Sequence, residues 1–588
     1  MSLSSKNKRP AKHRSIKKNR WFYGGIVGTW LLCLIHFDPK LFSVVTADDS
    51  LIAKGLFIVF ILFLNLFWLY GIFHCYFLIY RLVSKRTPLL FKNNSFISSP
   101  VAILYTTRND FQIKAALSCL QQSYPDFHLF ILDDSTEDSY KKKVDGFHDK
   151  FPALTTVIRR EDRKGFKAGN LNNALRHYIT DYDYFAVIDA DEVVPPDFLK
   201  KLMPYFGRDE NIAFVQAHHE QNAVQPSKFA QDLSLGINFH WDIYQPPRND
   251  CGFVIFYGHG AIIRRDVWKK VGGFPEIVSE DLAFAARIRQ LGFRGHFARE
   301  VTCYEDFPET YQQFRKRHEK WVKGACEYLH REFWPFLRSK RVTLPEKLDV
   351  MFSSFSLFIP ALFLIYLFLA NAVLPMLLAE KHMLQINLFG TNYELMPAYF
   401  MEPRFASLWT VDFYLMTLVG MFSPIFCYFG KALTNPKSII KLLFKSAVPY
   451  ISLILVASCG ILTYLFTKKA VFFATGDKSD SSDASSEGKN EKRFWEKLNA
   501  NHPLIFHLEW LLGVLLTYFS IKTINFALLT ISSCLILSPL VARYEWSNKA
   551  ISCLVSLPLL FVLLAFGSMG TGFLGISGFS LYFLAMHF

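Results

Sequence analysis

The sequence predicts a polytopic α-helical membrane protein with one α/β domain inserted between two membrane blocks. The chain has 588 residues, too many for one ordinary soluble domain, and 51% of them are hydrophobic. Between 95 and 345 the composition is that of a soluble domain, with charged residues, glycine and proline. Long apolar runs flank it, each able or nearly able to cross a hydrocarbon layer of roughly 30 Å. They lie at 22–38, 55–81, 352–379 and 407–430, with further apolar runs over 503–542 and 551–588.

The charge distribution predicts the side of the membrane on which the domain lies. The first twenty residues hold eight Lys or Arg and no acid, and the positive-inside rule keeps such a tail in the cytoplasm. The loop at 37–50 has one Lys and three Asp, which suits the outer face. A second apolar segment follows this loop, and no small-residue cleavage site separates it from the first, which argues against a cleaved signal peptide. We therefore expect a multi-pass protein of the cell (plasma or inner) membrane, with its N-terminus and its α/β domain in the cytoplasm.

The net charge and the cysteine spacing indicate which partners, disulfides and metal sites the protein can have. The formal charge of +15 implies anionic membrane lipids or a phosphorylated substrate. Binding of nucleic acid by the basic tail is the less favoured interpretation beside a membrane span, so no nucleic-acid partner is expected. The ten cysteines have no paired spacing, so neither a disulfide framework nor a zinc site is indicated.

The predicted domain order follows from these patterns. It comprises a basic cytoplasmic tail at 1–20, a transmembrane pair at 21–83, a cytoplasmic domain ending in interfacial helices at 95–345, transmembrane and interfacial helices at 350–467, a flexible cytoplasmic loop at 468–502 and transmembrane helices at 503–588. The run at 446–466 lies between Lys-rich and polar segments that should be cytoplasmic. We expect it to lie along the membrane or to enter and return, although hydropathy alone would make it a span. The segment 503–542 could form one long helix or two short ones.

Strands and helices alternate in the inserted domain, which predicts a mainly parallel sheet. Strands are expected at 101–110, 127–136 and 153–162, and a further strand ends at Ile188. Ligands of such sheets bind beyond the carboxyl ends of the strands. Four carboxylates follow two of these ends: Asp133, Asp134, Asp189 and Asp191.

The stretch "FAVIDADEVVPPDFL" places Asp189, Asp191 and Glu192 directly after an apolar strand. Carboxylates this close repel one another, so a positive charge should lie among them. Two acids at positions i and i+2 can hold a hard cation such as Mg²⁺, which typically also binds substrate phosphates. The alternative is a solvated turn, because Asp, Glu and Pro are common in turns.

Three further segments carry candidate chemistry. Lys164 and Lys167 precede a helix expected to open near Asn170. A helix N-terminus with nearby lysines suits phosphate binding, and the alternative interpretation is a basic surface loop. Ser279 is a plausible N-cap, and Glu280 and Asp281 follow it in the first turn of the expected helix. The helix dipole alone favours acids at these positions. The alternative is that Asp281, held rigidly at the helix start, acts as a general base. The basic amphipathic helix near 308–324 is typical of a membrane interface, and it places Arg317, Lys320 and Trp321 on one face.

These pieces, in this order, resemble the membrane-embedded family 2 glycosyltransferases, whose best-known members are the bacterial cellulose synthase catalytic subunits. The family has a strand-end Asp, D-x-D, T-E-D and Q-x-x-R-W on an interfacial helix. Here the corresponding stretches are Asp133–Asp134, "DAD" at 189–191, "SED" at 279–281 and "RHEKW" at 317–321. "KAGNLNNAL", "FVQAHHEQN" and "FYGHGAIIRRDVWKKVGGF" are similar to further family segments. The resemblance covers about residues 100–330.

The resemblance implies a GT-A-like nucleotide-sugar fold and inverting transfer from a UDP-sugar, with UDP-glucose as the first candidate. It implies Mg²⁺ or Mn²⁺ at Asp189 and Asp191, and a base role for Asp281 beside Glu280. The donor nucleotide and its diphosphate would contact Asp133, Asp134, Asp189, Lys167, Lys320 and Arg317. The acceptor, a polysaccharide or a glycolipid, would contact Trp321, Tyr257, Gly258 and His259. Accessory subunits are possible but cannot be identified from the sequence.

The sequence also departs from the family pattern. Arg317 stands where the family has Gln, and Lys320 stands where the family has Arg. Lys320 keeps the positive charge of an arginine but cannot form its bidentate hydrogen bonds. Residues 468–480 resemble the family's gating loop only loosely, since Asp477 falls where Lys is expected. We also expect this chain to lack the C-terminal regulatory module that many cellulose synthases carry.

Three functions are compatible with these patterns. The leading hypothesis is a processive synthase that passes a polysaccharide through its own helices. The second is an enzyme of the same fold that adds one sugar to a membrane lipid. The third is a transporter or receptor with a nucleotide-binding regulatory domain. Ionisable residues within the spans should mark a transport path, and the apolar runs contain few of them.

Overall fold

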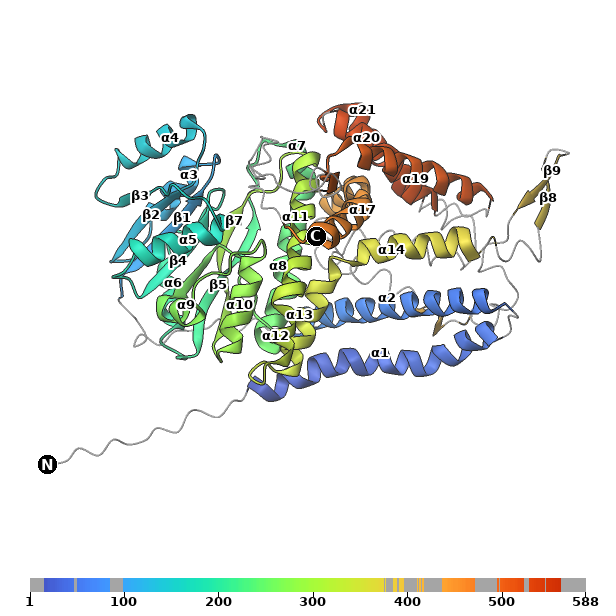
Figure 1. The fold of residues 1–588 in the computed structure, drawn as a ribbon, viewed down its shortest axis with the longest axis horizontal. Coiled ribbons are helices and arrows are strands. Elements are labelled where there is room, and N and C mark those ends of the chain that lie inside the picture. The colour runs from blue at the N-terminus through green and yellow to red at the C-terminus, as the bar shows by residue number, and fades with distance from the viewer. Residues whose placement is uncertain are drawn as a thin grey trace.

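The protein consists of an α/β domain and a set of long helices that extend from one side of it (Figure 1). The computed structural model describes residues 15–46, 50–84, 99–374, 436–470, 498–522, 528–544 and 546–561, with a few short stretches between 376 and 416 and near 494. The gating-like residues 471–480 and most of the basic tail lie outside the described residues.

The α/β domain contains a seven-stranded mixed sheet of order β3-β2-β1-β4-β6-β5-β7. Its strands are β1 Val101–Thr107, β2 Phe127–Asp133, β3 Thr155–Ile158, β4 Tyr184–Asp189, β5 Ile212–Gln221, β6 Ala261–Arg264 and β7 Arg294–Glu305. The first four strands in this order are parallel, and only β6 runs antiparallel to its neighbours. Apolar residues of β1, β2 and β4 are buried between the helices that cover both faces, as expected for parallel strands. The predicted α/β fold class is confirmed.

Helices of the domain connect these strands. They are α3 Ile113–Leu120, α4 Asp138–His148, α5 Phe166–His177, α6 Phe198–Leu202 (followed by a 3₁₀ turn at Met203–Tyr205), α7 Lys228–Leu233, α8 Leu235–Cys251, α9 Arg265–Val271, α10 Glu280–Gln290, α11 Tyr311–Arg331 and α12 Phe333–Arg338. The expected helix start near Asn170 is wrong by one turn. Gly165 adopts φ +75° and lets α5 begin at Phe166, so Lys167 lies in the first turn of that helix.

The remaining helices form the apolar block. They are α1 Ser15–Thr46, α2 Leu51–Val83, α13 Leu344–Ser356, α14 Ile359–Phe368 with a π turn at Leu369–Val373, α17 Pro436–Thr467, α19 Pro503–Lys522, α20 Leu528–Arg543 and α21 Lys549–Leu554, beside a hairpin of β8 Leu384–Leu388 and β9 Thr391–Leu395. Within the described residues, four helices are long and apolar enough to cross a membrane, or five if the bent pair α13–α14 is one span. Residues 503–542, left open between one helix and two, form the separate helices α19 and α20.

Helix α17 contains the run at 446–466 for which the sequence left two placements open. The run is one continuous helix with Pro449 inside it, so a segment that enters and returns is not what the structure contains. Figure 1 views α17 nearly end-on, whereas α1, α2 and α14 lie lengthwise, so α17 crosses the direction of these helices. Its length and composition also suit a span. The crossing direction favours the interfacial placement, which stays a prediction.

The basic helix α11 is not a simple interfacial helix. Arg315 has a fully buried side chain whose guanidinium donates to Glu509 Oε1 at 2.7 Å and to the carbonyl oxygen of Ala500 at 2.7 and 3.1 Å. Lys323 is also buried and pairs with Glu319 at 2.6 Å. Two cations of this helix therefore hold buried ion pairs inside the protein, while its interfacial placement stays a prediction.

The Arg315–Glu509 pair leads to a stability prediction. Glu509→Leu should destabilise the protein by about 3–5 kcal/mol, since it leaves a buried guanidinium without its counter-charge. The double variant Arg315→Met/Glu509→Leu should recover most of this loss, because apolar residues replace both charges. Thermal unfolding in detergent, followed by intrinsic fluorescence, measures both. A single variant as stable as the parent would contradict the buried pairing.

Candidate active site

The D-x-D segment leaves the sheet at the end of β4 and lines a cleft. Asp189 Oδ1 accepts hydrogen bonds from Lys167 Nζ and from Thr106 Oγ1, the latter at 3.0 Å. No hydrogen bond or ion pair to another described residue engages Asp191, which also lines the cleft. Burial and the neighbouring charge of Asp189 raise the pKa of Asp191 well above its usual value. An oxygen ligand without a partner beside a second carboxylate fits a bound divalent cation.

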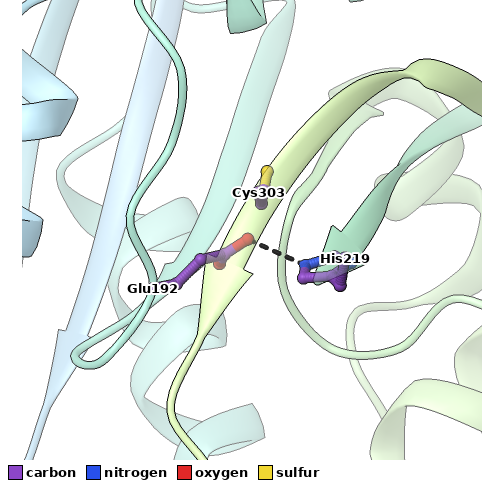
Figure 2. Close-up of side chains that lie close together, drawn as sticks. All are labelled: Glu192, His219 and Cys303. Carbon is purple, nitrogen blue, oxygen red and sulfur yellow. Dashed lines mark hydrogen bonds and ion pairs between the residues drawn. The ribbon is translucent and has the colours of Figure 1, made fainter. Parts of the chain in front are cut away.

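Glu192, the third acid of the segment, has a different environment. Its side chain is fully buried, with Oε1 2.9 Å from His219 Nε2 (Figure 2) and Oε2 3.2 Å from His259 Nδ1. Burial alone would lower the pKa of His259, but Glu192, Asp189 and Glu305 raise it to about 10. The positive charge expected among the three acids is therefore supplied in part by protein cations, Lys167 for Asp189 and His259 for Glu192.

Glu192, His219 and Cys303 also form a buried group with donor atoms within 4.8 Å of one another (Figure 2). Gly260, at φ +61°, packs directly against this group: a Cβ there would lie 2.3 Å from His219 Nε2 and 2.5 Å from Glu192 Oε1. The space beside these two atoms is thus occupied by the backbone of Gly260. The hydrogen bond between Glu192 and His219 anchors the D-x-D segment to β5.

Two of the predicted cations, Lys167 and Lys320, line the same cleft as Asp189 and Asp191. Lys167 Nζ also donates to the carbonyl oxygen of Gly258 at 3.0 Å, and Lys320 of α11 lines the cleft. Burial by itself would lower the pKa of Lys167, but the charges of Asp189, Glu280 and Asp281 raise it. Burial lowers the pKa of Lys320, and Glu280, Asp189 and Asp281 oppose this shift. Both ammonium groups therefore face the acids of both segments.

Asp281 lies at the start of α10, and its Oδ1 accepts the N–H of Leu282 at 2.7 Å. Burial raises the pKa of Asp281 and of its neighbour Glu280. Gly258, at φ +86°, fits between Asp281 and Lys167, since a Cβ there would lie 3.6 and 3.7 Å from their nearest atoms. The charge of His259 acts on both Asp191 and Asp281. The D-x-D segment and the S-E-D segment thus meet at one site.

The cleft has a volume of about 370 Å³ and contains five of the predicted site residues: Asp134, Lys167, Asp189, Asp191 and Lys320. Asp133 does not line it; this carboxylate is buried and pairs with Arg159 at 2.7 Å. Asp134 is held by Arg160 at 2.7 Å. The residues that follow β1, Arg108 to Gln112, also line the cleft and were not predicted from the sequence. The parallel register pairs Thr106 with Asp189 and Thr107 with Asp133, so this loop necessarily lies at the same sheet edge.

The remaining predicted residues lie beside the cleft. Trp321 has 43% of its surface exposed, and Arg317 stacks over the rings of Trp321 at 4.8 Å and Phe307 at 4.6 Å. Phe307 is part of the cleft wall, whereas Arg317 and Trp321 are not. The hydroxyl of Tyr257 accepts from Arg248 at 3.0 Å and from Gln245 at 2.6 Å. The hydroxyl of Tyr257 is therefore engaged by the protein, and the cleft wall does not include Tyr257, Gly258, His259, Glu280 or Asp281.

Comparison with known proteins shows what this domain is similar to. Residues 184–383 match the model of the family "Glycosyl transferase family group 2". Glucomannan 4-beta-mannosyltransferase 1 of Oryza sativa subsp. japonica is 27% identical over 261 residues, which are 43% of this chain and 50% of the relative. Glucomannan 4-beta-mannosyltransferase 2 of Arabidopsis thaliana is 26% identical over 260 residues, covering 43% of this chain and 48% of the relative. The chain spans about half the length of the curated relatives it matches.

A search of solved structures finds a mannosyltransferase, PcManGT from Pyrobaculum calidifontis, in complex with GDP-Man and Mn²⁺. It is 17% identical, with a TM-score of 0.41, and the match covers 65% of this chain and 99% of that one.

Proposed function

We propose that this chain, which is similar to the family 2 glycosyltransferases over residues 184–383, is a membrane-embedded, inverting synthase that extends a polysaccharide and passes it through its helices. The donor in this proposal is a nucleotide-activated mannose, with GDP-mannose as the first candidate. The two curated relatives reported above are named for mannosyl transfer, which does not support the UDP-glucose expected from the sequence. The acceptor is a growing β-linked chain of the glucomannan type.

The proposal rests on one observation: Asp189, Asp191, Lys167 and Lys320 line one cleft, and Asp281 lies beside Lys167 across Gly258. In inverting transfer, an acceptor hydroxyl oxygen attacks the anomeric carbon while the bond from that carbon to the donor phosphate breaks. The electron pair leaves with the nucleoside diphosphate, so negative charge grows there. Lys167 and Lys320 face this position and would neutralise the departing diphosphate.

The other residues take complementary roles in this proposal. Asp281, at the rigid start of α10, would accept the proton of the acceptor hydroxyl. Asp189 and Asp191 would hold Mg²⁺ or Mn²⁺, which as a Lewis acid stabilises negative charge on phosphoryl oxygens. Trp321 offers an exposed aromatic face for the C–H face of a pyranose ring. Arg317, stacked on Trp321, keeps this ring in one orientation.

The pH dependence of kcat/KM follows from two shifted groups. A base must be deprotonated, and burial raises the pKa of Asp281, so activity should fall as the pH decreases through this raised value. Lys320 must be protonated, and burial lowers its pKa, so activity should also fall as the pH increases through that lowered value. We expect a bell-shaped profile narrower than ordinary Asp and Lys values would give. Initial rates at saturating metal between pH 5 and 10 check it.

One assay tests the proposed function. Purified protein in lipid receives radiolabelled GDP-mannose or UDP-glucose with Mn²⁺ or Mg²⁺. Label from GDP-mannose in a polymer that resists lipid extraction is the expected result. Label in extracted lipid would instead identify an enzyme that adds one sugar to a lipid acceptor. Absence of turnover with both donors and both metals would overturn the assignment as a glycosyltransferase acting on these sugars.

A further inference from the structure

The loop between α8 and β6, residues 252–260, connects the site to the apolar block, and we call it the acceptor loop. Its second half is fixed from within the site: the carbonyl oxygen of Gly258 accepts from Lys167 at 3.0 Å, and His259 pairs with Glu192 at 3.2 Å. These two contacts come from α5 and from the segment after β4, which carry the donor-side residues. They position the end of the loop next to Asp281.

The first half of the acceptor loop is fixed by Arg248 and Asp349, two residues outside the cleft. Arg248 of α8 is 5% exposed and Asp349 of α13 is 1% exposed. Arg248 Nε donates to Asp349 Oδ1 at 3.2 Å, Nη1 to the hydroxyl of Tyr257 at 3.0 Å and Nη2 to Ser353 Oγ at 2.5 Å. Asp349 Oδ2 in turn accepts the backbone N–H of Phe253 at 2.9 Å. One guanidinium thus joins Tyr257 to α13.

The loop also begins in direct contact with two helices of the apolar block. A Cβ at Gly252 would lie 2.4 Å from Asp349 Oδ2 and 2.6 Å from the hydroxyl oxygen of Tyr23 in α1. Only a residue without a side chain can pass this close to both groups. The position of the acceptor loop is therefore set by α1 and α13 at its start and by the donor-side residues at its end.

We infer that Arg248 is a positioning residue that holds Tyr257 and the acceptor loop in register with the membrane helices, and thereby sets the affinity for the acceptor. The guanidinium reaches three partners through three different nitrogens, which a single lysine ammonium cannot do. The donor-side contacts of Lys167, Asp189 and Asp191 do not involve Arg248. The loop that it holds ends beside Asp281, the base of the proposed function, so we assign its role to the acceptor side, and this inference rests on the proposed function.

The test uses the full chain in lipid nanodiscs and the variant Arg248→Lys, which keeps the charge beside Asp349 but loses the fork. Hydrogen–deuterium exchange of the amides at 253–258 should become faster, while β4 and α5 keep the exchange of the parent. The KM for a β-1,4-linked mannohexaose acceptor should rise about tenfold, the effect of losing a hydrogen bond from a charged donor. The Kd for GDP with Mn²⁺ should stay unchanged.

Two further variants make the result decisive. Tyr257→Phe removes only the hydroxyl that Arg248 contacts, so it should change the exchange and the KM in the same direction. Arg294→Lys is the matched control, because Arg294 is half exposed and pairs with Asp209 at the surface. Unchanged exchange at 253–258 in both Arg248→Lys and Tyr257→Phe would overturn the inference, as would equal weakening of acceptor and GDP binding. If the parent chain binds neither GDP nor acceptor, the proposed function fails, and the exchange data alone decide whether Arg248 positions the loop.

Discussion

Asp191→Asn is expected to reduce sugar transfer by about 10³-fold or more. A bound cation contributes several kcal/mol to stabilising developing charge, and each 1.4 kcal/mol corresponds to about a factor of ten in rate. Asp191 is the carboxylate of the D-x-D segment that no other described residue engages, so its substitution removes a ligand without breaking an ion pair of the protein. Titration with Mn²⁺, followed by electron paramagnetic resonance, should show weaker binding in the variant.

A matched control separates this effect from a general loss of acidic charge. Asp197 lies six residues further along the chain, outside the cleft, and pairs with Lys201 on the surface of α6. Asp197→Asn should keep the transfer rate and the Mn²⁺ affinity of the parent. Full activity of Asp191→Asn would remove the D-x-D segment from the proposed metal site.

Asp281→Asn is expected to lower kcat by about 10²–10⁴-fold while the variant still binds the nucleoside diphosphate. A positioned base contributes this much to a rate, and an amide cannot accept the proton of the acceptor hydroxyl. The side chain of Asn has the same shape, and its carbonyl oxygen can still accept the N–H of Leu282 at the start of α10. Calorimetry with GDP and Mn²⁺ measures binding, and the radiolabel assay measures transfer.

The neighbouring acid provides the comparison for this variant. Glu280 is buried beside Asp281 and was also a candidate from the sequence, so Glu280→Gln should cost less activity than Asp281→Asn if Asp281 is the base. Loss of nucleotide binding in Asp281→Asn would remove this residue from the base role. A larger rate loss in Glu280→Gln would transfer that role to Glu280.

The sequence predicted the parts of the site that depend on local pattern. Continuous apolar runs that end in acid marked β2 and β4, and the parallel pairing of strands put Asp134, Asp189 and Asp191 at one edge. The N-terminal turn of α10 could be placed because Ser279, Glu280 and Asp281 precede an apolar stripe. The buried apolar stripe of α10 ends at Ile288, since Leu291 is the C-cap residue and is 37% exposed.

The rest depends on strand order and helix packing, which no local pattern encodes. His219 and His259 lie 27 and 67 residues after Glu192 in the chain, and they meet it only because β6 is inserted between β4 and β5. The partner of Arg315 is likewise found 194 residues later in the chain. A run of Lys and Arg beside a membrane span suggested an interfacial helix, whereas Arg315 is buried against Glu509 of α19 and Lys323 against Glu319 of α11 itself.

Helix α11 carries Lys320 at the cleft and Arg315 in its buried pair with Glu509, five residues apart, or about 7.5 Å along the axis at 1.5 Å per residue. Since Arg315 is fixed both to α19 and to the backbone of Ala500, this helix cannot slide or rotate without breaking those bonds. It therefore behaves as a rigid strut between the cleft and α19. In the proposed synthase, a tilt of α19 would be transmitted to the Lys320 ammonium group, which would couple export to bond formation.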